Sequence, residues 1–252
     1  MNSFPVKRFA LLTSFVCIFV CTAPGADQRI AFEKDDAVHI ANLEGSVIRN
    51  LTNGIFPAIS PDAKSVAFTT VDKTDGHSIR RLAVIEVASG QRQVFSGIPG
   101  DNAYNAAWSP DGKSIAFTLQ VDGLWHLGMI NTDGTDFKFI KKGEQDQVTL
   151  YSPCWARDGK SIFCEDMTNI YRLSLEGAIL AQWKITTIVP NGGMSGDSRI
   201  DVSPDGNRLL LSVEMDEAYD RKDWDGPVPA LWSFDLLTES AVRLTTKSLF
   251  AW

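Results

Sequence analysis

A nine-residue motif recurs four times along this chain at nearly constant spacing, and it constrains the fold more than any other feature. The copies align without gaps, and 49, 47 and 47 residues separate their first positions. So regular a spacing indicates tandem structural units that stack on one another. The four copies are Ser60–Phe68, Ser109–Phe117, Ala156–Cys164 and Ser203–Leu211.

Each copy predicts a β-hairpin, as the second one illustrates. Pro110 presets φ, the Asp111 side chain can accept a bond from downstream backbone, and Gly112 tolerates positive φ. The apolar runs on both sides of the turn are typical of strands buried between stacked sheets. A second turn separates a third strand from a fourth, so we name the strands of each unit A to D. It recurs at Leu43–Gly45, Ala88–Gly90, Thr132–Gly134, Leu175–Gly177 and, in degenerate form, Leu237–Glu239.

Four-stranded units that stack radially form an all-β propeller, because one sheet alone cannot bury both of its faces. The first unit begins with a B strand, Arg29–Phe32, and has no A strand before it. The segment Ser248–Trp252 matches the A strands at Asn105–Trp108 and Ser152–Trp155. Pairing it with the first unit would close a ring of five four-stranded blades and remove two exposed sheet edges. The alternative is a fragment of a six-bladed propeller cut at Trp252.

Residues 1–26 have the layout of a secretory signal peptide. Lys7 and Arg8 precede an apolar run, and small residues follow it. A retained membrane anchor is the alternative, but the run is shorter than the roughly 20 residues that span a bilayer. We therefore expect one propeller domain over residues 27–252, no transmembrane segment after signal removal, and a periplasmic or secreted location.

Net charge restricts the class of partner. The chain carries 24 basic and 31 acidic side chains, for a formal charge of −7, and removal of the signal takes away two bases and no acid. An acidic protein of this kind is not expected to bind nucleic acid. We expect a monomer.

Two cysteines, Cys154 and Cys164, stand after the signal segment, each five residues from Gly159 in a predicted hairpin turn. Cross-strand neighbours lie close enough for a disulfide, and an exported compartment is oxidising. The alternative is that both thiols are small buried apolar side chains.

The unit Ser109–Phe117 resembles the WD40-like (PD40) repeat of the TolB family, the periplasmic propeller of the Tol-Pal envelope system. The resemblance extends from Arg29 to Trp252. It implies a protein-protein interaction module whose partner is an envelope lipoprotein. TolB proteins carry a further N-terminal α/β domain and six blades, and related repeats occur in oligogalacturonate lyases and prolyl oligopeptidase-type peptidases.

The loops between B and C strands are rich in acidic residues and lie on one rim of the predicted propeller, where partners commonly dock. The longest, after Leu211, also contains aromatic side chains of the type that anchor interfaces. We expect a binding surface for a basic partner or a cation here; the alternative is a solvated acidic surface. The candidate residues are Asp36, Asp72, Asp122, Asp166, Asp216, Tyr219, Asp223 and Trp224.

No catalytic set is visible in the sequence. The three histidines are scattered one to a unit, which fits neither a zinc motif nor a Ser-His-Asp set. Asp201 is the one acid in the predicted innermost strands, where a propeller glycosidase would need paired carboxylates. We therefore expect an interaction module without a cofactor, apart from a cation in the acidic rim or channel. The alternative is an exported carbohydrate-active or ligand-binding propeller enzyme that uses the channel mouth.

Overall fold

The structure, a computed structural model, describes residues 29–46, 48–74, 76–143, 149–217 and 226–246. The predicted signal peptide, the predicted closing strand Ser248–Trp252, and the candidates Tyr219, Asp223 and Trp224 lie outside these residues. Strands dominate the described part, which has one short helix, α1 (Ile185–Ile188). This helix is far too short to cross a bilayer, and no described helix is long and apolar enough to do so.

The strands form five successive antiparallel units in chain order. A single parallel pair, Arg80 with Asn102, connects the second unit to the third. The first unit contains β1 (Arg29–Lys34), β2 (Ala37–Asn42) and β3 (Ile48–Asn53). The second contains β4 (Ile55–Ile59), β5 (Ser65–Thr74), β6 (His77–Glu86) and β7 (Arg92–Val94). The third contains β8 (Asn102–Trp108), β9 (Ser114–Val121), β10 (Leu124–Asn131) and β11 (Lys138–Lys141). The fourth contains β12 (Tyr151–Trp155), β13 (Ser161–Glu165), β14 (Asn169–Ser174) and β15 (Ile179–Lys184). The fifth contains β16 (Gly192–Gly193), β17 (Ile200–Val202), β18 (Arg208–Met215), β19 (Val228–Asp235) and β20 (Ala241–Arg243).

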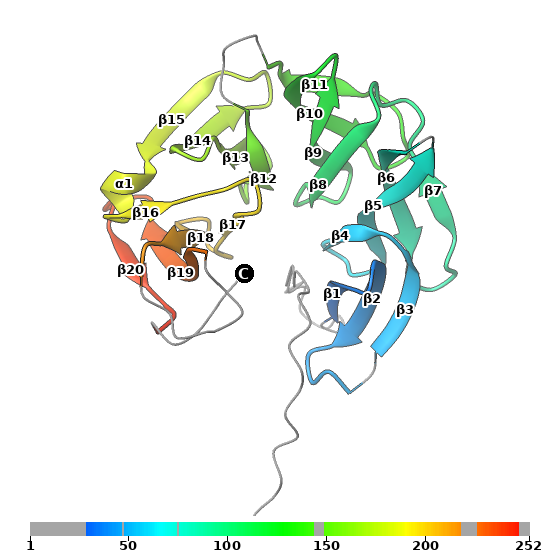
Figure 1. Cartoon of the computed structure of the whole chain (residues 1–252), viewed down its shortest axis with the longest axis horizontal. Helices are drawn as coiled ribbons and strands as arrows, with labels where there is room; N and C mark the ends of the chain where they lie inside the picture. Colours follow the sequence, from blue (N-terminus) through cyan, green and yellow to red (C-terminus); the bar gives the residue numbers. More distant parts are fainter. Residues whose placement is uncertain (1–28, 47, 75, 144–148, 218–225, 247–252) are drawn as a thin grey trace, which may run out of the picture.

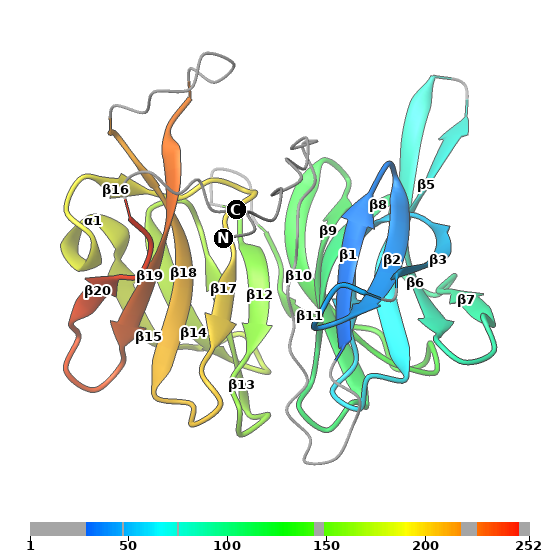
Figure 2. The same ribbon diagram turned by 90° about the horizontal axis from the view of Figure 1, so that it is seen from below.

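The five units stand around a common axis, with the A strands β4, β8, β12 and β17 innermost (Figure 1). Within each unit the strands alternate in direction, so the B-to-C hairpins and the starts of the A strands share one end of the axis. We call this end the upper rim. The strands β5, β6, β18 and β19 extend toward this end beyond their neighbours (Figure 2).

The turn of the repeat motif is held by the same two hydrogen bonds in the copies that begin at Ser60, Ser109 and Ser203. In the second, the Ser109 hydroxyl donates to Asp111 at 2.6 Å, and the Lys113 N–H donates to the same carboxylate oxygen at 3.1 Å. These two donors lower the pKa of Asp111, since both favour its charged form. The polar groups of these turn residues therefore stabilise the hairpin. The turns lie at the end of the axis opposite the upper rim, which we call the lower end.

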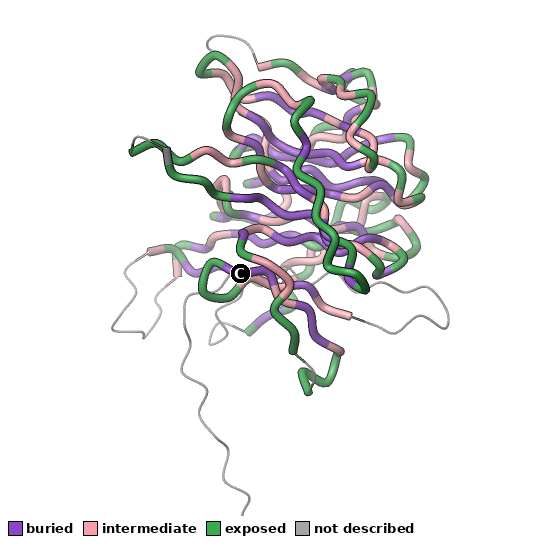
Figure 3. The backbone as a smooth tube through the Cα atoms, turned by 90° about the vertical axis from the view of Figure 1, so that its right-hand side faces the viewer, coloured by how far each residue is buried: buried purple, intermediate pink, exposed green. Residues whose placement is uncertain are grey.

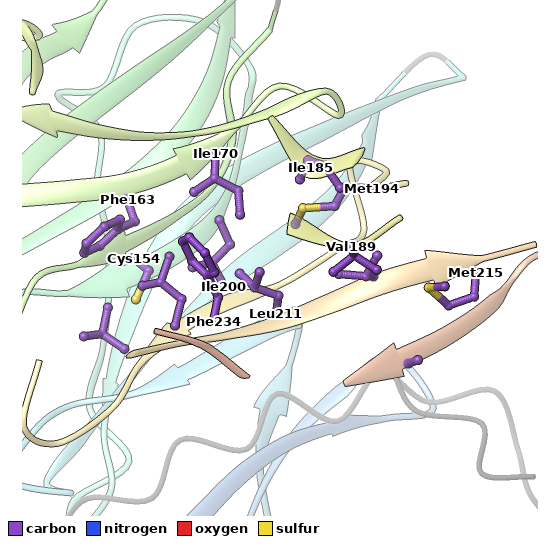
Figure 4. Packing of buried hydrophobic residues seen from close by; sticks show 14 of the residues in the cluster. Cys154, Phe163, Ile170, Ile185, Val189, Met194, Ile200, Leu211, Met215 and Phe234 are labelled. Atoms are coloured by element: carbon purple, nitrogen blue, oxygen red, sulfur yellow. The ribbon is translucent and has the colours of Figure 1, made fainter. Parts of the chain in front are cut away.

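Hydrophobic side chains are buried between neighbouring units, as the buried stretches in the middle of the strands show (Figure 3). The interface between the fourth and fifth units contains Phe163, Ile170 and Phe234 (Figure 4). Indole N–H groups also join units through backbone carbonyls. Trp108 donates to Ala58 at 2.9 Å and Trp155 donates to Ala107 at 3.0 Å. Trp108 and Trp155 thus tie the third unit to the second and the fourth unit to the third.

The two cysteines are free and buried, so the disulfide alternative is wrong and the apolar alternative holds in the structure. Cys154 lies opposite Phe163 in the β12–β13 register, one residue away from Cys164. Because successive side chains of a strand point to opposite faces, the two thiols lie in different interfaces.

The predicted strand order of the units agrees with the structure, and the first unit has no A strand among the described residues. The expected partner of β1, Ser248–Trp252, lies outside the described part of the chain, so ring closure and the number of blades stay predictions.

Candidate binding site at the axial mouth

The A strands begin at the upper rim with a β-bulge in the second, third and fourth units. The bulge residues Phe56, Asn105 and Ser152 have φ angles of 52°, 57° and 51°, and the strand register shifts at each of them. Bulges re-aim side chains and are frequent beside binding sites. In the repeat alignment the same position of the fifth unit is Arg199.

Arg199 lies over the ring of Phe56, with its guanidinium carbon 5.8 Å from the ring centroid. The two residues come from the fifth and second units, so this contact spans the axis. The Arg199 Nη1 donates to the carbonyl oxygens of Asp197 and Ser198, each at 3.0 Å. Among the described residues Nε and Nη2 have no hydrogen-bond partner, which leaves one side of the planar guanidinium available to a ligand.

Aromatic rings continue from this contact in a chain. The Phe56 and Tyr104 ring centroids lie 5.8 Å apart, and the edge of Tyr104 meets Trp125 at 5.4 Å. Burial, with a smaller contribution from Tyr151, raises the pKa of Tyr104 to about 12, so its phenol keeps its proton. We call Arg199, Phe56, Tyr104 and Trp125 the mouth cluster.

Two carboxyl groups lie near the mouth cluster at equivalent positions of two B strands. Glu33 accepts the Phe56 N–H at 3.0 Å, and burial raises its pKa despite this bond and despite Arg199. Glu165 has no exposed surface, and its Oε1 has no hydrogen-bond partner among the described residues. Burial, reinforced by Asp166 and Glu214, raises the pKa of Glu165 to about 7 although the Met167 N–H and Arg199 oppose the shift.

This geometry suits anion recognition. A planar guanidinium beside an aromatic ring can bind a carboxylate through paired hydrogen bonds, and the ring can hold the apolar part of the ligand.

The predicted acidic rim does not come together as one site. Asp36 and Asp122 are exposed at hairpin turns with φ of 56° and 52°, and Asp216 is exposed at the end of β18. Asp72 forms an exposed ion pair with Arg81 at 3.6 Å. No group of three His, Cys, Asp or Glu side chains in the described ranges could hold a metal ion. The described rim acids therefore occupy separate loops.

Asp166 differs from the other rim candidates because it is buried. Its oxygens accept bonds from the backbone N–H of Thr168 and Asn169 and from the Tyr171 hydroxyl. The carboxylate that we expected to contact a partner at the rim therefore accepts hydrogen bonds from its own loop. Asp201 pairs with Arg157 at 3.8 Å and lies 3.8 Å from the Cys154 thiol, between the fourth and fifth units.

Comparison with solved structures identifies the architecture. TolB from Acinetobacter baumannii superposes with a TM-score of 0.64 and 19% identity, covering 94% of this chain and 53% of that one. The chain is a β-propeller. A putative TolB from Agrobacterium tumefaciens matches the propeller with the same TM-score and 19% identity, over 86% of this chain and 76% of its own.

The sequence comparison adds a different class of relative. The propeller is 28% identical over 116 residues to dipeptidyl-peptidase 5 of Porphyromonas gingivalis, which is 43% of this chain and 17% of that protein. No family model matches the sequence. The chain thus spans about half of the first TolB and about a sixth of the peptidase.

Arg199 is the residue that the sequence analysis missed. The repeat places it in line with Phe56, four residues before the Ser of the turn motif, and a basic residue at that position was the available signal.

Proposed function

We propose that this propeller is a periplasmic, TolB-like interaction module that holds an acidic segment of a cell-envelope protein at its axial mouth. The contact of Arg199 with Phe56 across the axis carries the proposal. A carboxylate of the partner pairs with the free side of the guanidinium, and adjacent apolar groups pack on Phe56 and Tyr104.

The β18–β19 insertion is proposed to extend this surface. Glu217, at the start of the insertion, forms an ion pair with Arg243 of β20. Less than a fifth of either side chain is exposed. The pair fixes the base of the insertion on the fifth unit. Tyr219, Asp223 and Trp224 keep their proposed role as partner contacts, and deletion of residues 218–225 is expected to weaken capture of the partner.

A photocrosslinking experiment tests the site. Benzoylphenylalanine in place of Asp197, an exposed residue beside Arg199, is expected to give a discrete adduct with an envelope protein in intact cells. The adduct should fall about ten-fold in the Arg199→Gln background, since a charge-assisted pair is lost. The control site is Lys64, an exposed residue of the opposite end. Equal adducts from both sites, or an adduct that Arg199→Gln leaves unchanged, would contradict the proposal.

A second candidate is an exported propeller enzyme, or part of one, that acts on peptides or carbohydrates at the same mouth. The partial match to a dipeptidyl-peptidase favours it. Purified protein would then release dipeptides from a chromogenic substrate or shorten pectin oligomers, and Asp201→Asn would abolish the turnover. Absence of both activities in the wild type removes this candidate.

A further inference from the structure

A cavity of about 410 Å³ lies between the third and fourth units, close to the upper rim, and shares Trp125 with the mouth cluster. It falls in the size range of small-molecule sites. Trp125, Leu127 and Lys141 line it from the third unit, and Tyr171, Leu173 and Ile179 line it from the fourth.

The repeat motif places different side chains at the interfaces between the units. The last position of the repeat motif is Phe68 in the second unit and Phe117 in the third, and both rings are fully buried against the preceding unit. In the fourth unit the same position is Cys164. Cys164 packs in the same cluster as Leu127 and Leu173, two residues of the cavity wall. A small side chain thus stands where the second and third units have a ring and the fifth unit has Leu211.

The wall on the third unit is held in place at the end of β11. The Gly143 N–H donates to His126 Nδ1 at 2.9 Å. A Cβ at Gly143 would lie 2.0 Å from the Trp125 carbonyl oxygen, so the close approach of the two strands requires glycine. The edge of Tyr104 supports the Trp125 ring from the other side.

The wall on the fourth unit is held by Asp166. The Tyr171 hydroxyl donates to Asp166 at 2.5 Å, and the Asn169 side chain donates to the same carboxylate. The carboxylate is therefore saturated by its own loop and faces the cavity with its hydrogen-bonding capacity already used.

The charges at the cavity favour an anion. Lys141 and Lys142 both line it, and within the described ranges neither forms an ion pair. The Lys142 ammonium lies 5.0 Å from the centroid of the Phe139 ring, and the Asp166 carboxylate lines the same cavity as the two lysines. The remaining wall is apolar, with Leu127 and Leu173 fully buried and Ile179 56% exposed at the edge.

We propose that this cavity binds a small amphipathic anion, with its carboxylate or sulfonate on Lys141 and Lys142 and an aromatic or branched apolar body against Trp125 and Leu173. This site shares Trp125 with the mouth cluster, but Arg199 and Phe56 do not line it.

Anilinonaphthalene sulfonate is a suitable probe, because it combines a sulfonate with an aromatic body. The wild type is expected to bind one equivalent, measured by probe fluorescence and calorimetry. Affinity should fall about ten-fold in the double variant Lys141→Gln, Lys142→Gln, because both cationic partners are lost. Lys138→Gln, which removes an exposed lysine of the same strand outside the cavity, should leave affinity unchanged.

An uncharged probe, phenylnaphthylamine, separates the role of charge from damage to the fold. It should bind the wild type and the double variant equally. Arg199→Gln should leave sulfonate binding unchanged, so failure of this site and failure of the proposed mouth are distinguishable. The inference is overturned if the double variant binds the sulfonate as tightly as the wild type, or if Lys138→Gln weakens it equally.

Discussion

At pH 8 the Glu165→Gln variant is expected to be more stable than the wild type by about 3 kcal/mol, and near pH 4 the two should be almost equally stable. Glu165 is fully buried, and one carboxyl oxygen has no partner among the described residues. Burial raises its folded-state pKa from 4.5 to about 7.

The sign follows from proton linkage. Below pH 4.5 the carboxyl is protonated in both the folded and the unfolded chain, so the shifted pKa has no effect on stability. As pH rises through the window between 4.5 and about 7, the unfolded chain ionises while the folded chain keeps its proton. Stability is lost across this window and the loss is complete above it. The neutral amide of the Glu165→Gln variant removes the dependence and can still accept the Met167 N–H.

Denaturant unfolding of both proteins at several pH values measures this effect. Other groups also titrate, but they do so in both proteins, and the difference between the curves isolates Glu165. Glu176→Gln, which replaces a more accessible acid of the same unit, is the matched control and should not change the slope. A constant difference between wild type and Glu165→Gln from pH 4 to pH 8 would show that Glu165 titrates normally.

Replacement of Phe117 by alanine is expected to destabilise the propeller by about 3 to 5 kcal/mol, the range for a large cavity in a packed core. Phe117 has no exposed surface. It packs between the second and third units with Ile115, Leu119 and Ile130, and its ring lies 6.2 Å from Phe137. The units contribute most of each other's buried surface, so a void between two of them weakens the whole arrangement.

Cys164→Ala supplies a control at the same repeat position of the next unit. Cys164 is also fully buried, but the substitution removes only one sulfur atom. We therefore expect the free energy of unfolding to fall by roughly 1 kcal/mol. Thermal and denaturant unfolding compare the two variants. If both variants lost similar amounts of unfolding free energy, the size of the side chain at this repeat position would not determine how well the interfaces pack.

The repeat predicted the strands well because each strand is defined locally, by an apolar run between two turns. The hairpins around Pro110 and Gly112 lie where the motif places them, and the bonds at Asp111 explain the turn chemistry. The first described strand, β1, occupies the B position of the first unit, where the alignment placed Arg29–Phe32.

The cysteine prediction depended on register, which the sequence determines less tightly. Cys154 and Cys164 are equally far from Gly159 in the sequence, and they would face each other only if the hairpin were symmetrical about that residue. The turn instead closes with Trp155 opposite Ile162, which moves the pairing by one residue and turns the two thiols to opposite faces.

The site was only partly predictable for a related reason. The position of Arg199 at the start of an A strand follows from the repeat, but its contact with Phe56 joins residues 143 positions apart in different units. Whether they meet depends on the curvature with which the units surround the axis. The rim acids were predicted from their loops, and their separation likewise depends on that curvature.

A double-mutant cycle between Arg199 and a ligand carboxylate tests the central claim of an anion-binding mouth most directly. The ligand is an acidic peptide selected against the propeller from a random display library, measured by calorimetry beside a version whose acid is replaced by the amide. Arg199→Gln and the amide replacement should each weaken binding, and their effects should not add, with a coupling of about 1 to 3 kcal/mol. Fully additive losses, or a peptide that binds Arg199→Gln as tightly as the wild type, would contradict it.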